Sequence, residues 1–127
     1  MRAPVLLCID DRPEFLLVRK TMFERLGGSV LTATTASAAI ALLERTAVAA
    51  VLLEYKHEGM DAEAVACQIK RRFPTQPVIL LSAYSDVPER VLWLVDEYVM
   101  RSDPPERVIQ LVDCLSDGRA RVQAAAA

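Results

Sequence analysis

Five polar residues of this chain stand where an apolar run ends, which is where a folded sheet exposes groups that can react. Asp10 and Asp11 follow the first run, Glu54 ends a later one, and Ser82 and Arg101 close two more. Carboxylates that are brought together repel one another and need a cation among them. A set of oxygen ligands suits Mg²⁺, which keeps several waters and accepts phosphoryl oxygens. The residue types therefore predict a site for a cation and a phosphoryl group, provided that these runs meet in space.

The elements that must position these residues form a regular alternation of apolar runs and amphipathic segments. Strands are predicted at Pro4–Asp10, Ser29–Thr34, Ala49–Glu54, Pro77–Ala83 and Glu97–Met100, and helices at Pro13–Leu26, Ser37–Arg45, Asp61–Phe73, Pro88–Val95 and Pro105–Leu115. In the first helix, Phe15, Val18, Met22 and Leu26 recur at helical spacing and predict the buried stripe. Such alternation favours an α/β fold in which a parallel sheet is covered on both faces through right-handed crossovers. The carboxyl ends of its strands share one edge, so the five polar residues should converge there.

Composition limits the class of protein. With 127 residues, of which 53% are apolar, the chain is long enough for one domain with its own core. A formal net charge of -2 provides no basic field for nucleic acid and no polybasic patch for a membrane surface. Cys8, Cys67 and Cys114 lie in apolar or helical surroundings without a close-spaced partner, so we expect reduced core thiols in a cytoplasmic protein. No signal-peptide pattern and no run long enough for a bilayer is found.

Five motifs occur in a fixed order along the chain. They are the acidic pair before "RPEF", the acid that ends "VLLE", the "GMD" that follows it, "VILLSA", and "EYVMR" followed by "DPPE". In combination they resemble the receiver domain of response regulators in two-component signalling, from Val5 to about Leu115. The resemblance implies the flavodoxin-like, doubly wound five-stranded sheet with strand order 2-1-3-4-5. It also implies a receiver-like domain over residues 1–118, with 119–127 as a disordered or frayed tail.

The resemblance assigns a role to each matching residue. Asp10 and Asp11 match the pair that holds Mg²⁺, and the backbone carbonyl of Lys56 matches a further metal ligand. Glu54 takes the place of the aspartate that accepts a phosphoryl group and also faces the metal. The other matches are Ser82, which would bind the phosphoryl oxygen, Tyr98, which would move inward when it does, and Arg101, which replaces the family's lysine. The implied partners are a histidine kinase, a phosphotransfer protein or an output protein.

Two of these matches depart from the family pattern. Glu54 is one methylene longer than aspartate, so its carboxylate should enter the space of a bound phosphoryl group, and in-line transfer tolerates little misplacement. Arg101 presents a planar fork that pairs with a carboxylate, whereas lysine is a compact charge. We therefore expect a Glu54–Arg101 pair that partly mimics the phosphorylated state, and weak or absent Mg²⁺ binding. Lys56 either adds a second positive charge to this site or is simply solvated.

A second group of departures lies between Ser82 and Arg101. This segment is shorter than usual by about one helical turn, and it carries Trp93. The fourth helix, fifth strand and fifth helix form the surface that receivers use for dimerisation and output, so we expect a remodelled surface and a candidate homodimer contact there. Trp93 is either an interface anchor or part of the core. His57, the only histidine, is expected to be solvated.

Two hypotheses of function follow. In the first, the chain is a pseudo-receiver, a protein-interaction module that is not an enzyme. In the second, it is a working Mg²⁺-dependent receiver that catalyses at most its own phosphorylation and dephosphorylation. The alternatives without a functional role are that Asp10 and Asp11 only cap the first helix, that Glu54 is an exposed strand-end acid, and that Ser82 is an ordinary strand-end hydroxyl. The sequence leaves open the cognate kinase, the output pathway, the oligomeric state, and whether the domain stands alone.

Overall fold

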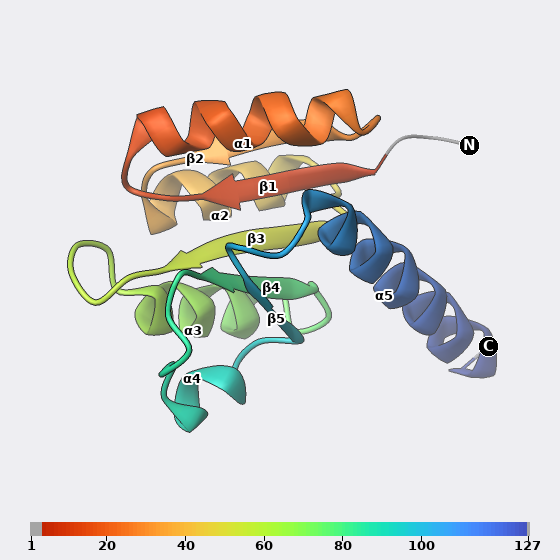
Figure 1. The fold of residues 1–127 in the computed structure, drawn as a ribbon. Coiled ribbons are helices and arrows are strands. Elements are labelled where there is room, and N and C mark those ends of the chain that lie inside the picture. The colour runs from red at the N-terminus through yellow and green to blue at the C-terminus, as the bar shows by residue number, and fades with distance from the viewer. Residues whose placement is uncertain (1–3, 127) are drawn as a thin grey trace.

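A five-stranded parallel sheet forms the centre of the molecule, with helices on both faces (Figure 1). The computed structural model describes residues 4–126, with side chains up to residue 116. The strands are β1 (Val5–Ile9), β2 (Ser29–Ala33), β3 (Ala50–Tyr55), β4 (Val78–Ser82) and β5 (Glu97–Met100), and the helices are α1 (Pro13–Arg25), α2 (Ala36–Arg45), α3 (Ala62–Arg72), α4 (Glu89–Leu92) and α5 (Pro105–Ala126). The strand order β2-β1-β3-β4-β5 is the predicted one, so the predicted fold is confirmed.

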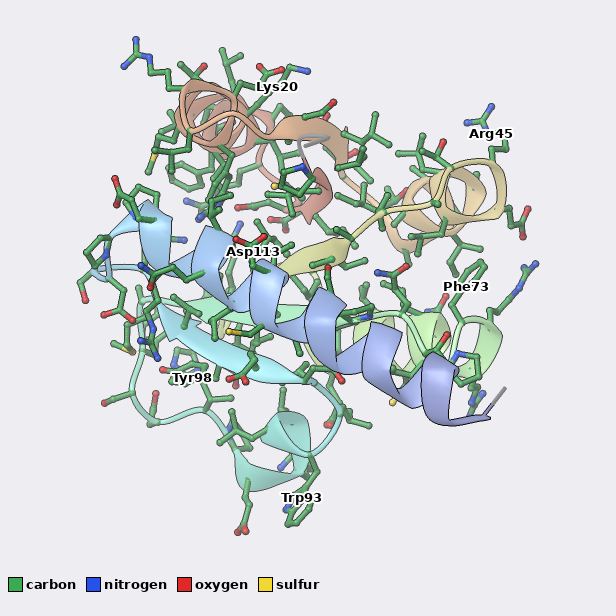
Figure 2. The ribbon with its side chains drawn as sticks, turned by 90° about the vertical axis from the view of Figure 1, so that its right-hand side faces the viewer. Lys20, Arg45, Phe73, Trp93, Tyr98 and Asp113 are labelled. Carbon is green, nitrogen blue, oxygen red and sulfur yellow. The ribbon has the colours of Figure 1, made fainter. Side chains whose placement is uncertain are left out.

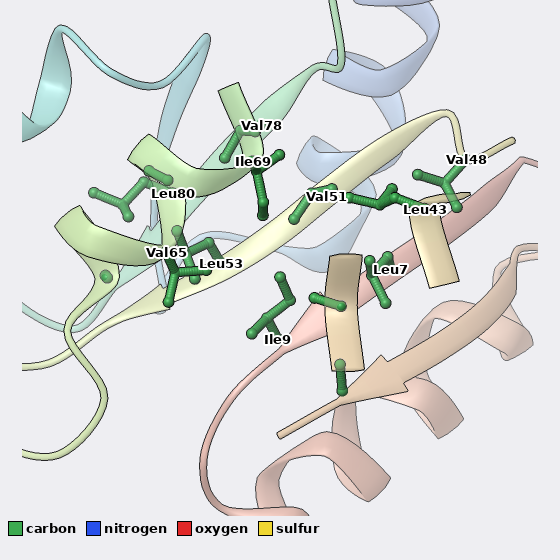
Figure 3. Close-up of a cluster of buried hydrophobic side chains, with 14 of the residues drawn as sticks. Leu7, Ile9, Leu43, Val48, Val51, Leu53, Val65, Ile69, Val78 and Leu80 are labelled. Atoms are coloured by element: carbon green, nitrogen blue, oxygen red, sulfur yellow. The ribbon is translucent and has the colours of Figure 1, made fainter. Parts of the chain in front are cut away.

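The continuous apolar runs form strands because the sheet buries them from both sides. Successive side chains of a strand point to opposite faces. Leu7 and Ile9 of β1 therefore join the core under α2, α3 and α4, which Figure 3 shows with Leu53 of β3 beside them. Leu6 and Cys8 point the other way, into the core under α1 and α5. The same parity sends Glu54 of β3 to the side of α1 and α5.

The predicted stripe of α1 is wrong by one position. The structure buries Leu16 and Phe23 of this helix, while Val18 and Met22 are exposed. Apolar side chains occur on several sides of α1, including Leu17, which is 66% exposed, so the spacing alone does not define which side faces the sheet. The correction matters for the site, because Arg19 lies on the same face of α1 as Leu16 and Phe23 and is turned inward with them.

The remaining differences lie in the helices near the end of the chain. α4 is a single turn of four residues, Glu89–Leu92, and is therefore shorter than the predicted helix Pro88–Val95. The structure continues α5 through Ala126, where the sequence analysis expects a disordered or frayed tail; alanine, which dominates this tail, has the highest helix propensity. Cys8 is buried, but Cys114 is exposed, so the expectation of three core thiols is wrong for that residue. None of the helices of residues 4–126 is both long and apolar enough to cross a membrane.

Candidate functional site

The carboxylate of Glu54 lies buried at the carboxyl end of β3, between two guanidinium groups. Nη2 of Arg19 donates a hydrogen bond to Glu54 Oε2 over 2.8 Å. Nη2 of Arg101 lies against the other oxygen, Oε1, as an ion-pair partner that is outside hydrogen-bond geometry. The structure thus brings Glu54 and Arg101 together as the sequence analysis expects, and Glu54 is not the exposed acid of the alternative interpretation. An ionised carboxylate tolerates such burial only when it is paired.

Arg19 is the site residue that the sequence analysis missed. It lies on α1 between Leu16 and Phe23, at the spacing that turns all three toward the sheet. Its side chain is only 13% exposed, and this burial lowers the pKa of its guanidinium. Burial, with the charge of Arg19 close by, also lowers the pKa of Arg101. The two guanidinium groups therefore repel each other across the carboxylate that holds them together.

Asp10 and Asp11 form a second charged cluster beside the first, with Lys56 between them. Nζ of Lys56 contacts Asp10 Oδ1 and lies 2.7 Å from Asp11 Oδ1. The hydrogen bond from Lys56 lowers the pKa of Asp11, and a backbone hydrogen bond from Met60 adds to it. The lysine side chain is 13% exposed, so the interpretation of Lys56 as a solvated residue is wrong. The acids do not merely cap α1 either, because that helix begins at Pro13, and its N-cap residue, Arg12, makes no side-chain cap hydrogen bond.

The oxygens that would bind Mg²⁺ in this corner are already engaged. Asp10 Oδ1 accepts from the Arg12 amide over 3.0 Å, Asp11 Oδ2 accepts from the Met60 amide over 2.9 Å, and Lys56 occupies the space between the acids. Of the oxygens of this acid pair, Asp10 Oδ2 is buried without a hydrogen-bond partner. Among residues 4–116, no three His, Cys, Asp or Glu side chains converge as a metal site would require. Since Mg²⁺ demands a nearly octahedral set of oxygens, the residues as arranged do not fit it.

Ser82 and Tyr98 lie on neighbouring strands but do not reach Glu54. The Ser82 hydroxyl is buried and accepts a hydrogen bond from the Tyr84 amide over 2.9 Å, which agrees with the ordinary strand-end role. The Tyr98 hydroxyl donates to the carbonyl oxygen of Tyr84 and lies 2.8 Å from Met100 Sδ. Burial raises the pKa of Tyr98. Both side chains are thus tied to the loop that follows β4.

An open cleft of about 290 Å³ lies over the two charged clusters. Phe15 lines it, and three cationic groups, those of Arg12, Lys56 and Arg101, lie 5.4–5.6 Å from the centroid of the Phe15 ring. His57 lines the same cleft, and the centroid of its ring lies 4.1 Å from that of Tyr84. Its side chain is 45% exposed, as the sequence analysis expects.

Trp93 lies away from this edge of the sheet. Its side chain is 80% exposed next to the single turn of α4, and Figure 2 shows it pointing outward from the body of the molecule. The alternative in which Trp93 packs in the core is therefore wrong. Leu92, its neighbour, is 37% exposed. Tryptophan is enriched among the residues that contribute most to binding at protein interfaces.

Comparisons with known proteins agree with this fold. The family model described as the response regulator receiver domain matches residues 6–99. The chain is 31% identical over 108 residues to the sensor protein GacS of Pseudomonas syringae pv. syringae, and the match covers 79% of this chain and 12% of GacS. It is 36% identical over 92 residues to the response regulator protein FleR of Pseudomonas aeruginosa, covering 72% and 19% of the two chains. The chain thus spans only a small part of the length of these relatives.

Solved structures give the same picture. The response regulator protein TrrA of Thermotoga maritima, solved in complex with Mg²⁺ and BeF, superposes with a TM-score of 0.76 at 26% identity and covers 88% of this chain and 98% of its own. A response regulator receiver domain protein from Clostridium thermocellum superposes with a TM-score of 0.80 at 20% identity, over 94% and 98% of the two chains.

Proposed function

The chain belongs to the response-regulator receiver family of two-component phosphorelay signalling, and we propose that it is a pseudo-receiver within it. Such a domain passes on a signal through protein contacts, in a state that does not depend on phosphorylation. It acts in the cytoplasm with a histidine kinase, a phosphotransfer protein or an output protein as its partner. Relatives named as a sensor histidine kinase and as response regulators support this range of partners.

The observation that carries this proposal is the pairing of buried Glu54 with Arg19 and Arg101. Transfer of a phosphoryl group to a carboxylate requires an oxygen that is free to attack along the line of the leaving group. In this chain one oxygen accepts a hydrogen bond from Arg19 and the other is covered by Arg101. The carboxylate holds Arg101 by its negative charge, as the oxygens of an acyl phosphate would hold a cation.

Glu54 mimics an acyl phosphate only in its contact with Arg101. Ser82 bonds to the amide of Tyr84, and Tyr98 bonds to the carbonyl of the same residue, so neither contacts Glu54. We therefore propose that Glu54 fixes the position of Arg101 and of β5, and that Ser82 and Tyr98 stabilise the loop between β4 and α4. Tyr98 is then a structural residue of this loop more than a moving switch.

We place the contact with a partner on α4, β5 and α5, centred on Trp93. Three features support this surface: the exposure of Trp93, the single turn of α4, and the link from Glu54 through Arg101 to the end of β5. A second copy of the chain is one candidate partner for it. Sedimentation of the wild type and of Trp93→Ala distinguishes a homodimer from a contact with another protein.

Intact mass after incubation with acetyl phosphate and Mg²⁺ tests the pseudo-receiver directly. The wild type should gain no phosphoryl group, because both oxygens of Glu54 are held. A Glu54→Asp variant shortens the side chain and should gain part of the reactivity. The matched control is Glu24→Asp, the same change at an exposed position of α1, which should remain unlabelled. A stoichiometric, base-labile adduct on wild-type Glu54 would establish the working receiver and end the proposal.

A further inference from the structure

The side chain of Lys56 lies where a cation is needed. Its Nζ contacts Oδ1 of Asp10 and lies 2.7 Å from Oδ1 of Asp11. An ammonium group has three donors on a compact charge, so it can bind two carboxylates at once. The side chains of Asp10 and Lys56 are nearly excluded from solvent, at 1% and 13% exposure. The contact is therefore built into the site and differs from a surface ion pair.

The loop that carries Lys56 is fixed to the same acid at its other end. The Met60 amide donates to Asp11 Oδ2 over 2.9 Å. Gly59 before it has a φ of +91°, and a Cβ added there would lie 2.5 Å from Asp11 Oδ2, so only glycine allows the backbone to approach this closely. The segment from Lys56 to Met60 thus encloses Asp11, with an ammonium group on one oxygen and a backbone amide on the other.

The charges of the corner balance without a metal. The acids Asp10, Asp11 and Glu54 contribute three negative charges, and Lys56, Arg19 and Arg101 contribute three positive charges through direct contacts. Two adjacent carboxylates stay ionised together only if a cation lies between them. Lys56 supplies that cation from the chain itself, and a divalent ion would have to displace its ammonium group to reach the same two oxygens.

We infer that the Lys56 ammonium is an intramolecular replacement for the divalent cation of this site, so that the acid pair is complete without metal. The inference deepens the proposed function and rests on it for its signalling consequence, which is a site that does not respond to Mg²⁺. The ligands for a divalent cation are still present under the Lys56 ammonium group. They are Asp10 and Asp11, and Asp10 Oδ2 is buried without a hydrogen-bond partner. Removal of the ammonium group should therefore expose a divalent-cation site.

Two measurements test this inference. The first is Mn²⁺ binding, monitored by the loss of the EPR signal of free Mn²⁺. The second is the melting temperature in EDTA compared with that in millimolar MgCl₂. Lys56→Met keeps most of the stem and removes the charge. It should melt below the wild type in EDTA, recover with MgCl₂, and bind Mn²⁺ at least tenfold more tightly, since a ligand of the folded state stabilises it. The wild type and Lys20→Met, which removes an ammonium from a half-exposed site on α1, should not respond.

Two further outcomes keep the inference open to refutation. Adding Asp11→Asn to Lys56→Met should abolish the gained Mn²⁺ binding. If the variants do not fold, paramagnetic broadening of the Met60 amide by millimolar Mn²⁺ in the wild type decides the matter, and broadening there would overturn the inference. A Lys56→Met protein that folds but gains no metal affinity would overturn it too. Neither result depends on phosphodonor labelling of Glu54, so failure here is distinguishable from failure of the pseudo-receiver proposal.

Discussion

The carboxyl edge of the sheet and the region around α4 are built in opposite ways. At the tips of β1 and β3, three buried or half-buried acids are each held by a basic side chain of the same chain. Around α4, by contrast, a single helical turn covers the sheet, and Trp93 beside it is 80% exposed. The first region satisfies its charges internally. The second leaves apolar surface exposed.

This contrast is the structural basis of the proposal that the chain is a pseudo-receiver. A receiver that is switched by phosphate needs free acids at the input and a movable surface at the output. Here the free acids are missing, because Arg19 and Lys56 engage them, while the exposed surface remains. Paired acids with an exposed surface are what we expect of a receiver fold whose conformation is fixed by its own side chains and not by phosphorylation. Substitutions in the two regions should therefore have very different effects.

The largest effect should come from Arg19→Met. This change leaves Glu54 buried with one partner, and breaking a buried ion pair from one side costs about 3–5 kcal/mol of unfolding free energy. Arg101 remains in contact, so the lower end of this range, about 3 kcal/mol, is expected. Urea denaturation of the variant at neutral pH measures it.

Two control variants separate pairing from packing. Arg25→Met on the exposed side of the same helix should change the unfolding free energy by less than about 0.5 kcal/mol. Combining Arg19→Met with Glu54→Leu removes the charge together with its partner and should restore most of the loss. If Arg19→Met is as stable as the wild type, Glu54 does not depend on this pair and the contrast between the regions fails.

The next effect concerns the two neighbouring positions Val91 and Trp93. Val91 is 1% exposed, so Val91→Ala should cost about 2 kcal/mol through lost burial and a small cavity. Trp93→Ala removes a larger side chain but should change stability by less than about 0.5 kcal/mol, because that side chain contacts mainly solvent. Urea denaturation measures both. A large loss for Trp93→Ala would mean that Trp93 supports the fold and is not available to a partner.

The sheet was predictable from sequence because its strands are continuous apolar runs bounded by polar residues. The shared edge of the strand tips followed from it, and the Glu54–Arg101 contact was expected from this edge together with the resemblance to receivers. Arg19 could not be found in this way, since α1 carries apolar residues on several sides and an arginine on a helix that faces solvent is usually solvated. The signal was present in the spacing from Leu16 through Arg19 to Phe23, which buries a charge between two core residues.

The side chain of Lys56 illustrates a different limit. Its distance from Glu54 along the chain places it in the loop after β3, and the resemblance to receivers gives a role to its backbone carbonyl. The direction of a flexible four-carbon stem depends on the fold of that loop, which Gly59 and the Met60 amide set through Asp11. That contact joins residues far apart in sequence, so spacing along the chain carries no sign of it.

The smallest effect should appear in the pH dependence of Asp11. Its pKa is held below the ordinary value by the hydrogen bond from Lys56 and, next, by the Met60 amide. A carboxyl whose pKa is lower in the folded than in the unfolded state stabilises the fold above the ordinary pKa near 3.9, and this contribution is lost as the pH falls through the folded pKa.

Lys56→Met should raise the Asp11 pKa toward the ordinary value in a ¹³C carboxyl NMR titration, and its melting temperature should approach that of the wild type in acid. Lys20→Met should leave the Asp11 titration unchanged. An Asp11 pKa that is equal in the wild type and Lys56→Met would show that the ammonium group does not lower this pKa. The low pKa of Asp11 would then depend on the backbone amide of Met60 instead.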